Sequence, residues 1–168
     1  MFDRVVVVDW SASSAPTSGP DSIWVACRDW HGPATPPVNL PTRAAAVEHL
    51  VDLLDVPGRV LAGFDFAFGY PAGFAAAAGL AGEPWSATWA WLAEQLTDDD
   101  RNRNNRFAVA AMLNRRLGRA HFWGSPAAQE GPWLPRRRPV WGPEHLPAHR
   151  DTERALLQEG LRPFTVWQ

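Results

Sequence analysis

Four consecutive valines, Val5 to Val8, form the segment that most limits how this chain can fold. A continuous run of β-branched side chains is typical of a strand that is buried on both faces of a sheet. Asp9 follows this run directly, and a serine-rich stretch comes next. A carboxylate at the end of a buried strand is costly unless it has a partner. The sequence therefore predicts a buried first strand and a specific role for Asp9 at its end.

The segments after the first strand alternate between strand and helix patterns. Apolar stretches predict two further strands, over 21–30 and 59–66, and the Pro-rich loop after the first of them has room for a short edge strand over 38–40. Thr42 is the predicted N-cap of a helix over 42–55, which has apolar residues on one face. A helix between strands favours a right-handed crossover, which makes the strand over 59–66 parallel to the first. We therefore expect an α/β fold with a mixed sheet, in which an antiparallel meander precedes a parallel crossover strand.

The second half of the chain is predicted to be mainly helical, with helices over 71–80, 84–97, 105–118 and 149–160. Residues 126–147 contain six prolines and are expected to form an irregular loop. A further strand is predicted to begin at residue 162, and the chain ends within it. We thus expect one domain over 1–168, with a helical and Pro-rich insertion over about 71–148 and a C-terminus truncated within the fold.

Composition excludes several classes of protein. Cys27 is the only cysteine, which excludes an internal disulfide framework and a zinc site built from several cysteines. All 16 basic residues are arginine, so chemistry that needs a lysine, such as a phosphate-loop lysine or a Schiff base, is excluded. No apolar run reaches the length of a membrane span, and the first residues do not resemble a signal peptide. We expect a cytoplasmic protein that does not enter a membrane.

Charge is distributed unevenly along the chain. Residues 1–100 contain 4 arginines and 13 acidic residues, a net charge of −9, whereas residues 101–168 contain 12 arginines and 5 acidic residues, a net charge of +7. This asymmetry indicates either a solvated dipolar surface or an acidic site accompanied by an arginine-rich surface that binds phosphates.

Two aspartates end apolar strand patterns, Asp9 in VVVVDW and Asp65 in LAGFDF. The carboxyl ends of adjacent parallel strands lie at the same edge of a sheet, where α/β proteins form their sites. Two carboxylates placed together repel each other unless one is protonated or a cation lies between them. Carboxylate oxygens suit Mg²⁺ or Mn²⁺, which also assist phosphate chemistry. Asp9 and Asp65 are therefore candidate metal ligands; the alternative is that each aspartate caps its own turn.

Serines and arginines are the candidate phosphate contacts. Ser11 and Ser13 either bind a phosphate through their hydroxyls or only stabilise the turn after the first strand. The stretch over 101–126 has six arginines and no acidic residue, and guanidinium groups suit phosphates: Arg101, Arg103, Arg106, Arg115, Arg116 and Arg119. The aspartates at 98–100 are able to neutralise part of this charge instead.

Asn114 and Glu153 are polar residues on faces of predicted helices that also carry apolar residues. Asn114 shares a face with Phe107 and Leu117, so it is either a buried hydrogen-bond bridge or a site residue, and we favour the site. Glu153 lies at the start of the last predicted helix on the face of Arg150. It is either the third carboxylate of a metal site or a partner of Arg150 and the helix dipole.

The ordered motifs VVVVDWSASS, GFDFAFGYP and the R-x-x-E of HRDTERAL resemble a bacterial domain-of-unknown-function family of predicted RNase H-like nucleases, over most of the chain. The resemblance implies a five-stranded mixed sheet with helices, and a divalent metal held by acidic residues at neighbouring strand ends. Asp9 and Asp65 match two of these ligands, and Arg150 and Glu153 match the later charged motif. The same superfamily includes sugar kinases and actin-like ATPases.

We therefore expect a metal-dependent nuclease or phosphoesterase that acts on nucleic acid, with Mg²⁺ or Mn²⁺ as cofactor and with Asp9, Asp65 and Glu153 as catalytic residues and metal ligands. The expected substrate contacts are Ser11, Ser13, Arg106, Asn114 and Arg150. One alternative is a nucleotide-binding phosphotransferase of the actin-like or sugar-kinase type, acting on a phosphorylated small molecule. Another is a non-catalytic interaction domain of the same fold. The oligomeric state stays open, a homodimer included.

Overall fold

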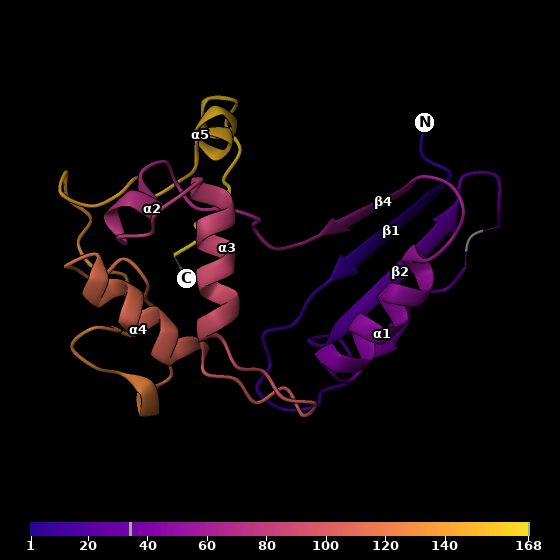
Figure 1. Ribbon diagram of the computed structural model, residues 1–168, viewed down its shortest axis with the longest axis horizontal. Coiled ribbons are helices and arrows are strands. Elements are labelled where there is room, and N and C mark those ends of the chain that lie inside the picture. Colours follow the sequence, from indigo (N-terminus) through magenta and orange to yellow (C-terminus); the bar gives the residue numbers. More distant parts are fainter. Residues whose placement is uncertain (34, 168) are drawn as a thin grey trace. The chain divides into compact units, whose positions relative to one another are not determined.

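The computed structural model of the protein describes residues 1–33 and 35–167. The chain forms two compact units. The first unit comprises Met1–Ala67 and Thr97–Asn104; the second comprises Phe68–Leu96 and the chain from Asn105 onward. In Figure 1, the labelled strands and helix α1 (Arg43–Leu54) belong to the first unit, and the other labelled helices belong to the second. The expectation of one domain with an insertion stays a prediction.

The first unit contains a four-stranded mixed sheet of β1 (Arg4–Asp9), β2 (Ile23–Asp29), β3 (Val38–Leu40) and β4 (Val60–Phe64). The order of the strands in the sheet is β3-β2-β1-β4. β1 pairs antiparallel with β2 and parallel with β4, and β2 pairs antiparallel with β3. This arrangement confirms the predicted mixed α/β sheet with its parallel crossover strand, whereas its RNase H-like form stays a prediction.

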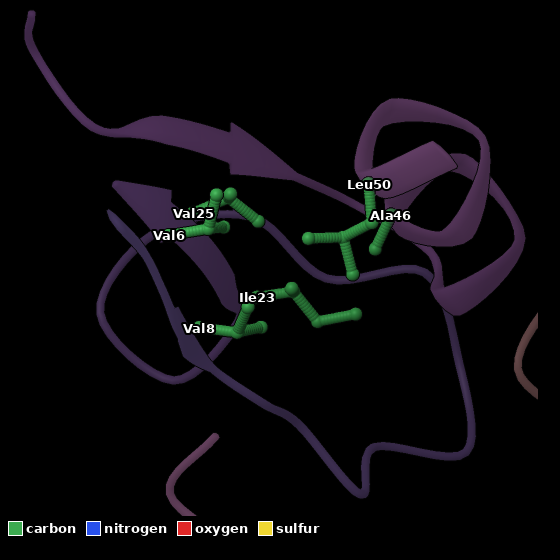
Figure 2. Packing of buried hydrophobic residues seen from close by; sticks show 6 residues of the cluster. All are labelled: Val6, Val8, Ile23, Val25, Ala46 and Leu50. Atoms are coloured by element: carbon green, nitrogen blue, oxygen red, sulfur yellow. The ribbon is translucent and has the colours of Figure 1, made fainter. Parts of the chain in front are cut away.

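Helix α1, Arg43–Leu54, packs on one face of this sheet. Thr42 begins the helix as predicted, because its side chain accepts a hydrogen bond from the backbone N–H of Ala45. Figure 2 shows the apolar side chains of two strands meeting those of the helix. The buried residues of this core are Val6, Val8, Ile23, Val25, Ala46 and Leu50.

The opposite face of the sheet is open within the first unit. Side chains alternate between the two faces of a strand, so Val7 and Leu61 point away from the core that contains Val6. Val7 is 56% exposed and Leu61 is 45% exposed. The expectation that the valine run is buried on both faces is therefore wrong for this unit, because its only described helix covers one face.

The second unit is helical around an aromatic core. Its helices are α2 (Phe74–Ala77), α3 (Pro84–Gln95), α4 (Arg106–Arg116), a 3-10 turn (Ala127–Gln129) and α5 (Asp151–Gln158). Trp167 is buried at the centre of this core, and its ring centroid lies 5.1 Å from those of both Phe122 and His121. The indole N–H of Trp167 donates to the carbonyl of Pro147 at 3.0 Å.

Two sequence-based elements in the second unit differ from the structure. The helix expected over 71–80 is only the four residues of α2, because Gly73 precedes it with a left-handed φ of 88° that a helix cannot contain. The strand expected from residue 162 is absent over 162–167; Gln168 lies outside the described residues. Trp167 packs into the aromatic core instead of pairing with a strand, and Pro163 lacks an N–H for a ladder. The described residues thus form four strands, one fewer than the resemblance implies.

Across residues 1–33 and 35–167, no helix has both the length and the apolar character needed to cross a membrane.

Candidate functional site

The carboxyl ends of β1 and β4 bring Asp9 and Asp65 to the same edge of the sheet. Val8 is aligned with Phe64 in the parallel register, and the backbone N–H of Asp65 donates to the carbonyl of Val8 at 3.2 Å. Asp9 and Asp65 directly follow this aligned pair. The predicted juxtaposition of the two strand ends is therefore present in the first unit.

The carboxylate of Asp65 bonds to the neighbouring strand end and not to its own turn. Its Oδ1 atom accepts a hydrogen bond of 2.9 Å from the backbone N–H of Trp10. Trp10 packs edge-on against Phe64, with ring centroids 6.1 Å apart, which further ties the two strand ends together. This contact fixes one oxygen of Asp65 and leaves Oδ2 without a hydrogen bond among the described residues.

Asp9 is exposed, and its carboxylate makes no hydrogen bond or ion pair with any described residue. Neither Asp9 nor Asp65 faces a described arginine that would neutralise it. Two exposed carboxylates at one sheet edge, with oxygens unused by the protein, are a donor set that suits a hard divalent cation. No group of three or more histidine, cysteine or acidic residues able to hold a metal is found among the described residues.

The serines after Asp9 build their own turn. The hydroxyl of Ser11 donates to the carbonyl of Asp21 at 3.2 Å and accepts the N–H of Ser13. The hydroxyl of Ser13 bonds to Ala15 and to the hydroxyl of Thr17, 2.9 Å away. The turn-forming alternative thus accounts for both serines, and their contact with a phosphate stays a prediction.

Arg43, which the sequence presents only as the first residue of α1, holds this turn in place. A guanidinium group has five N–H donors, and Arg43 uses all of them while it is buried. Nη1 donates to the carbonyls of Ser11 and Ser13, at 3.0 and 2.8 Å. Nε and Nη2 both donate to the carboxylate of Asp98, and Nη2 also donates to the carbonyl of Asn102 at 2.7 Å. Arg43 therefore connects the turn after Asp9 to a segment that begins 55 positions after Arg43 itself.

Asn102 completes this connection from the same distant segment. It is buried, and it has a left-handed φ of 66°, which asparagine tolerates better than most residues. Its Oδ1 accepts the backbone N–H of Arg43 at 2.8 Å, and its Nδ2 donates to the carbonyls of Ala15 and Pro41, both at 3.2 Å. We call Arg43, Asp98 and Asn102 the arginine clamp. In the sequence, only the aspartates at 98–100 pointed to this cluster, because they were expected to neutralise arginines.

In the second unit, Glu153 is paired with Arg150. Its Oε2 accepts the backbone N–H of Arg150 at 2.8 Å, and its Oε1 accepts Nη2 of the same residue at 2.6 Å. Burial opposes ionisation of Glu153, but these hydrogen bonds lower its pKa below the ordinary value. This is the helix-start pairing left open from the sequence, and a role of Glu153 as a metal ligand or of Arg150 as a substrate contact stays a prediction.

Asn114 is fully buried in the second unit and bridges three segments. Its Oδ1 accepts the backbone N–H groups of His121 and Phe122, at 2.7 and 2.8 Å. Its Nδ2 donates to the carbonyls of Phe122 and Trp133, at 2.8 and 2.7 Å. Because all its hydrogen-bonding positions are used internally, the structure favours the buried bridge over the substrate contact that we preferred from the sequence.

The arginines of 101–126 have different surroundings. Arg103 pairs with Asp99 at 2.8 Å, as the acidic stretch suggested. Arg106 lies over the ring of Phe107, 4.3 Å from its centroid, and Arg116 lies over Trp91. Arg106 as a substrate contact stays a prediction.

Comparison with family models, with curated proteins and with solved structures found no match for this chain. The family resemblance drawn from its motifs therefore stays a prediction.

Proposed function

We propose that the protein is a metal-dependent nuclease or phosphoesterase of RNase H-like fold that acts on nucleic acid. The observation that carries this proposal is the parallel pairing of β1 with β4, which places Asp9 and Asp65 at one sheet edge. Their exposed carboxylates would hold Mg²⁺ or Mn²⁺, and a metal bound there would activate a water and neutralise charge on a phosphate.

Neighbouring residues fix the carboxylate of Asp65 and the backbone just after Asp9. Asp65 is held by the N–H of Trp10 at 2.9 Å, which orients the carboxylate without neutralising it. The arginine clamp fixes the backbone at Ser11 and Ser13, just after Asp9. A carboxylate that is oriented before the metal binds, as that of Asp65 is, loses less freedom on binding than a mobile carboxylate does.

The test is cleavage of single-stranded, duplex and hybrid substrates with Mg²⁺ or Mn²⁺ present. We expect cleavage that requires the metal and is lost in Asp9→Asn and in Asp65→Asn. Asp100→Asn is the matched control, because Asp100 is an exposed acidic residue of the same unit whose side chain makes no described contact. Cleavage that persists in both site variants would refute the proposed mechanism.

A second candidate, the non-catalytic interaction domain, is favoured by the open face of the sheet. Val7 and Leu61 expose apolar surface there, and exposed apolar patches mark binding surfaces. This candidate predicts no stabilisation by Mn²⁺ and a defined complex or oligomer in solution. The phosphotransferase alternative has no comparable support, because the hydroxyls of Ser11 and Ser13 already bond within the loop between β1 and β2.

A further inference from the structure

A cavity of about 370 Å³ lies in the second unit, lined by residues around α2 and by the first turn of α3. This volume is within the range of small-molecule binding sites. Its lining is mainly apolar, and Tyr70 and Glu83 add polar groups to the exposed ring of Trp85. None of the site residues predicted from the sequence lines this cavity.

Trp85 is exposed but held in one orientation. Its side chain is 59% exposed, and its indole N–H donates to the carbonyl of Phe68 at 3.1 Å. The indole N–H of Trp89, one turn further along α3, donates to the same carbonyl at 3.1 Å. An aromatic ring that is exposed and already ordered is a platform on which a flat ligand stacks at little entropic cost.

Tyr70 and Glu83 supply one donor and one acceptor. The ring of Tyr70 stacks on Phe74 with centroids 4.2 Å apart, and burial raises the pKa of its hydroxyl, which therefore stays protonated. That hydroxyl has no hydrogen-bond partner within the described part of the chain. The carboxylate of Glu83 accepts the N–H of Ser86 at 2.9 Å, and backbone hydrogen bonds from Ser86 and Trp85 lower its pKa, so it is an ionised acceptor.

The net charge of the second unit matches a polyanionic ligand. This unit contains ten arginines and seven acidic residues, a net charge of +3, whereas the first unit contains six arginines and eleven acidic residues, a net charge of −5. A positive net charge attracts the phosphate backbone of a nucleic acid irrespective of its sequence.

We propose that this cavity binds an unpaired base of a single-stranded nucleic acid. The base stacks on Trp85, while its edge accepts a hydrogen bond from the hydroxyl of Tyr70 and donates one to the carboxylate of Glu83. Adenine, cytosine and guanine each carry an amino group and hydrogen-bond acceptors on their edges, which match this pair. The inference rests on the proposed action on nucleic acid, for which it names single strands as the substrate class.

Binding is measured by fluorescence anisotropy with a labelled oligo(dC) and with an abasic strand of the same length, in EDTA so that no metal-dependent cleavage occurs. We expect the wild type to bind the abasic strand at least about tenfold more weakly than oligo(dC), since stacking on an aromatic ring supplies that much affinity. Equal affinity for the two strands would overturn the proposal.

Trp85→Ala is expected to weaken oligo(dC) binding about tenfold and Tyr70→Phe about fivefold, because the latter removes one neutral hydrogen bond and keeps the ring. Trp30→Ala is the matched control, because Trp30 is a similarly exposed tryptophan, 52%, of the first unit. Affinity that is unchanged in Trp85→Ala would also overturn the proposal.

Two separate measurements distinguish this inference from the proposed nuclease: binding of oligo(dC) in EDTA, and cleavage with Mg²⁺ or Mn²⁺ present. If binding depends on Trp85 while the wild type cleaves nothing, base binding in the cavity is supported and the nuclease activity is refuted. If the wild type cleaves in a metal-dependent way while Trp85→Ala binds normally, base binding in the cavity is refuted and the nuclease activity is supported.

Discussion

The Oδ1 atom of Asp65 accepts a hydrogen bond of 2.9 Å from the backbone N–H of Trp10, so the carboxylate that ends β4 is tied to the residue after Asp9. The donor in this contact, a backbone N–H, is neutral, so it orients the carboxylate of Asp65 at the sheet edge without pairing it with a positive charge. Asp65 consequently keeps its negative charge available to a cation, which an ion pair with an arginine would not allow.

Replacing Asp65 separates orientation from charge. Asp65→Asn retains an oxygen that accepts the N–H of Trp10, whereas Asp65→Ala removes it. We expect Asp65→Ala to lower the free energy of unfolding by about 1 kcal/mol and Asp65→Asn by less, as measured by urea denaturation. Asp100→Ala should leave the free energy unchanged. Equal stability of Asp65→Ala and wild type would mean that the bond to Trp10 does not hold the strand ends together.

The arginine clamp is expected to be the largest single polar contribution to the first unit. Arg43→Met leaves the carboxylate of Asp98 and several carbonyls without their partner, so we expect a loss of about 3 kcal/mol in denaturant unfolding. Arg43→Lys keeps the charge but offers fewer donors, and its loss should be intermediate. Arg59→Met, at an exposed arginine of the same unit, should change stability by less than about 0.5 kcal/mol. A loss of that small size in Arg43→Met would show that the clamp does not stabilise the turn.

The buried hydrogen bonds of Asn114 predict which of two variants is the less stable one. Asn114→Asp puts a carboxylate oxygen against the carbonyls of Phe122 and Trp133, where Nδ2 now donates. We expect it to cost about 3 kcal/mol or more and to be worse than Asn114→Ala, which adds no repulsion. Thermal and urea unfolding of the two variants measure this. If Asn114→Asp were as stable as wild type, the side chain would not be a buried bridge.

His121 predicts a loss of stability on mild acidification. Its Nε2 accepts the backbone N–H of Leu146 at 2.9 Å, which requires a neutral ring. Burial lowers the pKa of His121 below its ordinary value of 6.5, and the charges of His145 and Arg119 act in the same direction. The unfolded chain therefore takes up a proton at a higher pH than the folded chain does. Stability is complete above about pH 6.5 and falls as the pH decreases toward the folded pKa.

The measurement is the free energy of unfolding between pH 7.5 and pH 5 for wild type, His121→Gln and the exposed control His31→Gln, a range that spans the ordinary histidine value. We expect the slope to be steeper in wild type and His31→Gln than in His121→Gln. The same slope in all three proteins would contradict the assignment to His121.

The strands and the parallel pairing of the candidate ligands could be predicted from the sequence because their signals are local. The valine run, the cap at Thr42 and the apolar stretch before Asp65 each specify an element without reference to distant residues. The arginine clamp could not be predicted in this way. Arg43 meets Asp98 and Asn102 only through the fold, and no periodicity marks residues that far apart.

The strand predicted at the end of the chain was wrong because contacts with distant residues outweigh the local pattern there. An apolar β-prone stretch around Val166 has the pattern of a strand, but burial of Trp167 among aromatic rings outweighs strand pairing there. Asn114 was ambiguous for a similar reason, since a polar residue on an apolar helix face fits a bridge and a site equally well. Only the four contacts of its side chain distinguish the two.

The most direct test of the central claim is a calorimetric titration of the protein with Mn²⁺, without any substrate. If Asp9 and Asp65 form a metal site, the wild type and Asp100→Asn should bind Mn²⁺ with equal affinity. Asp9→Asn and Asp65→Asn should each bind at least about tenfold more weakly, a difference of about 1.4 kcal/mol. Mn²⁺ affinity that is the same in all four proteins would contradict the claim that these two strand ends hold a metal.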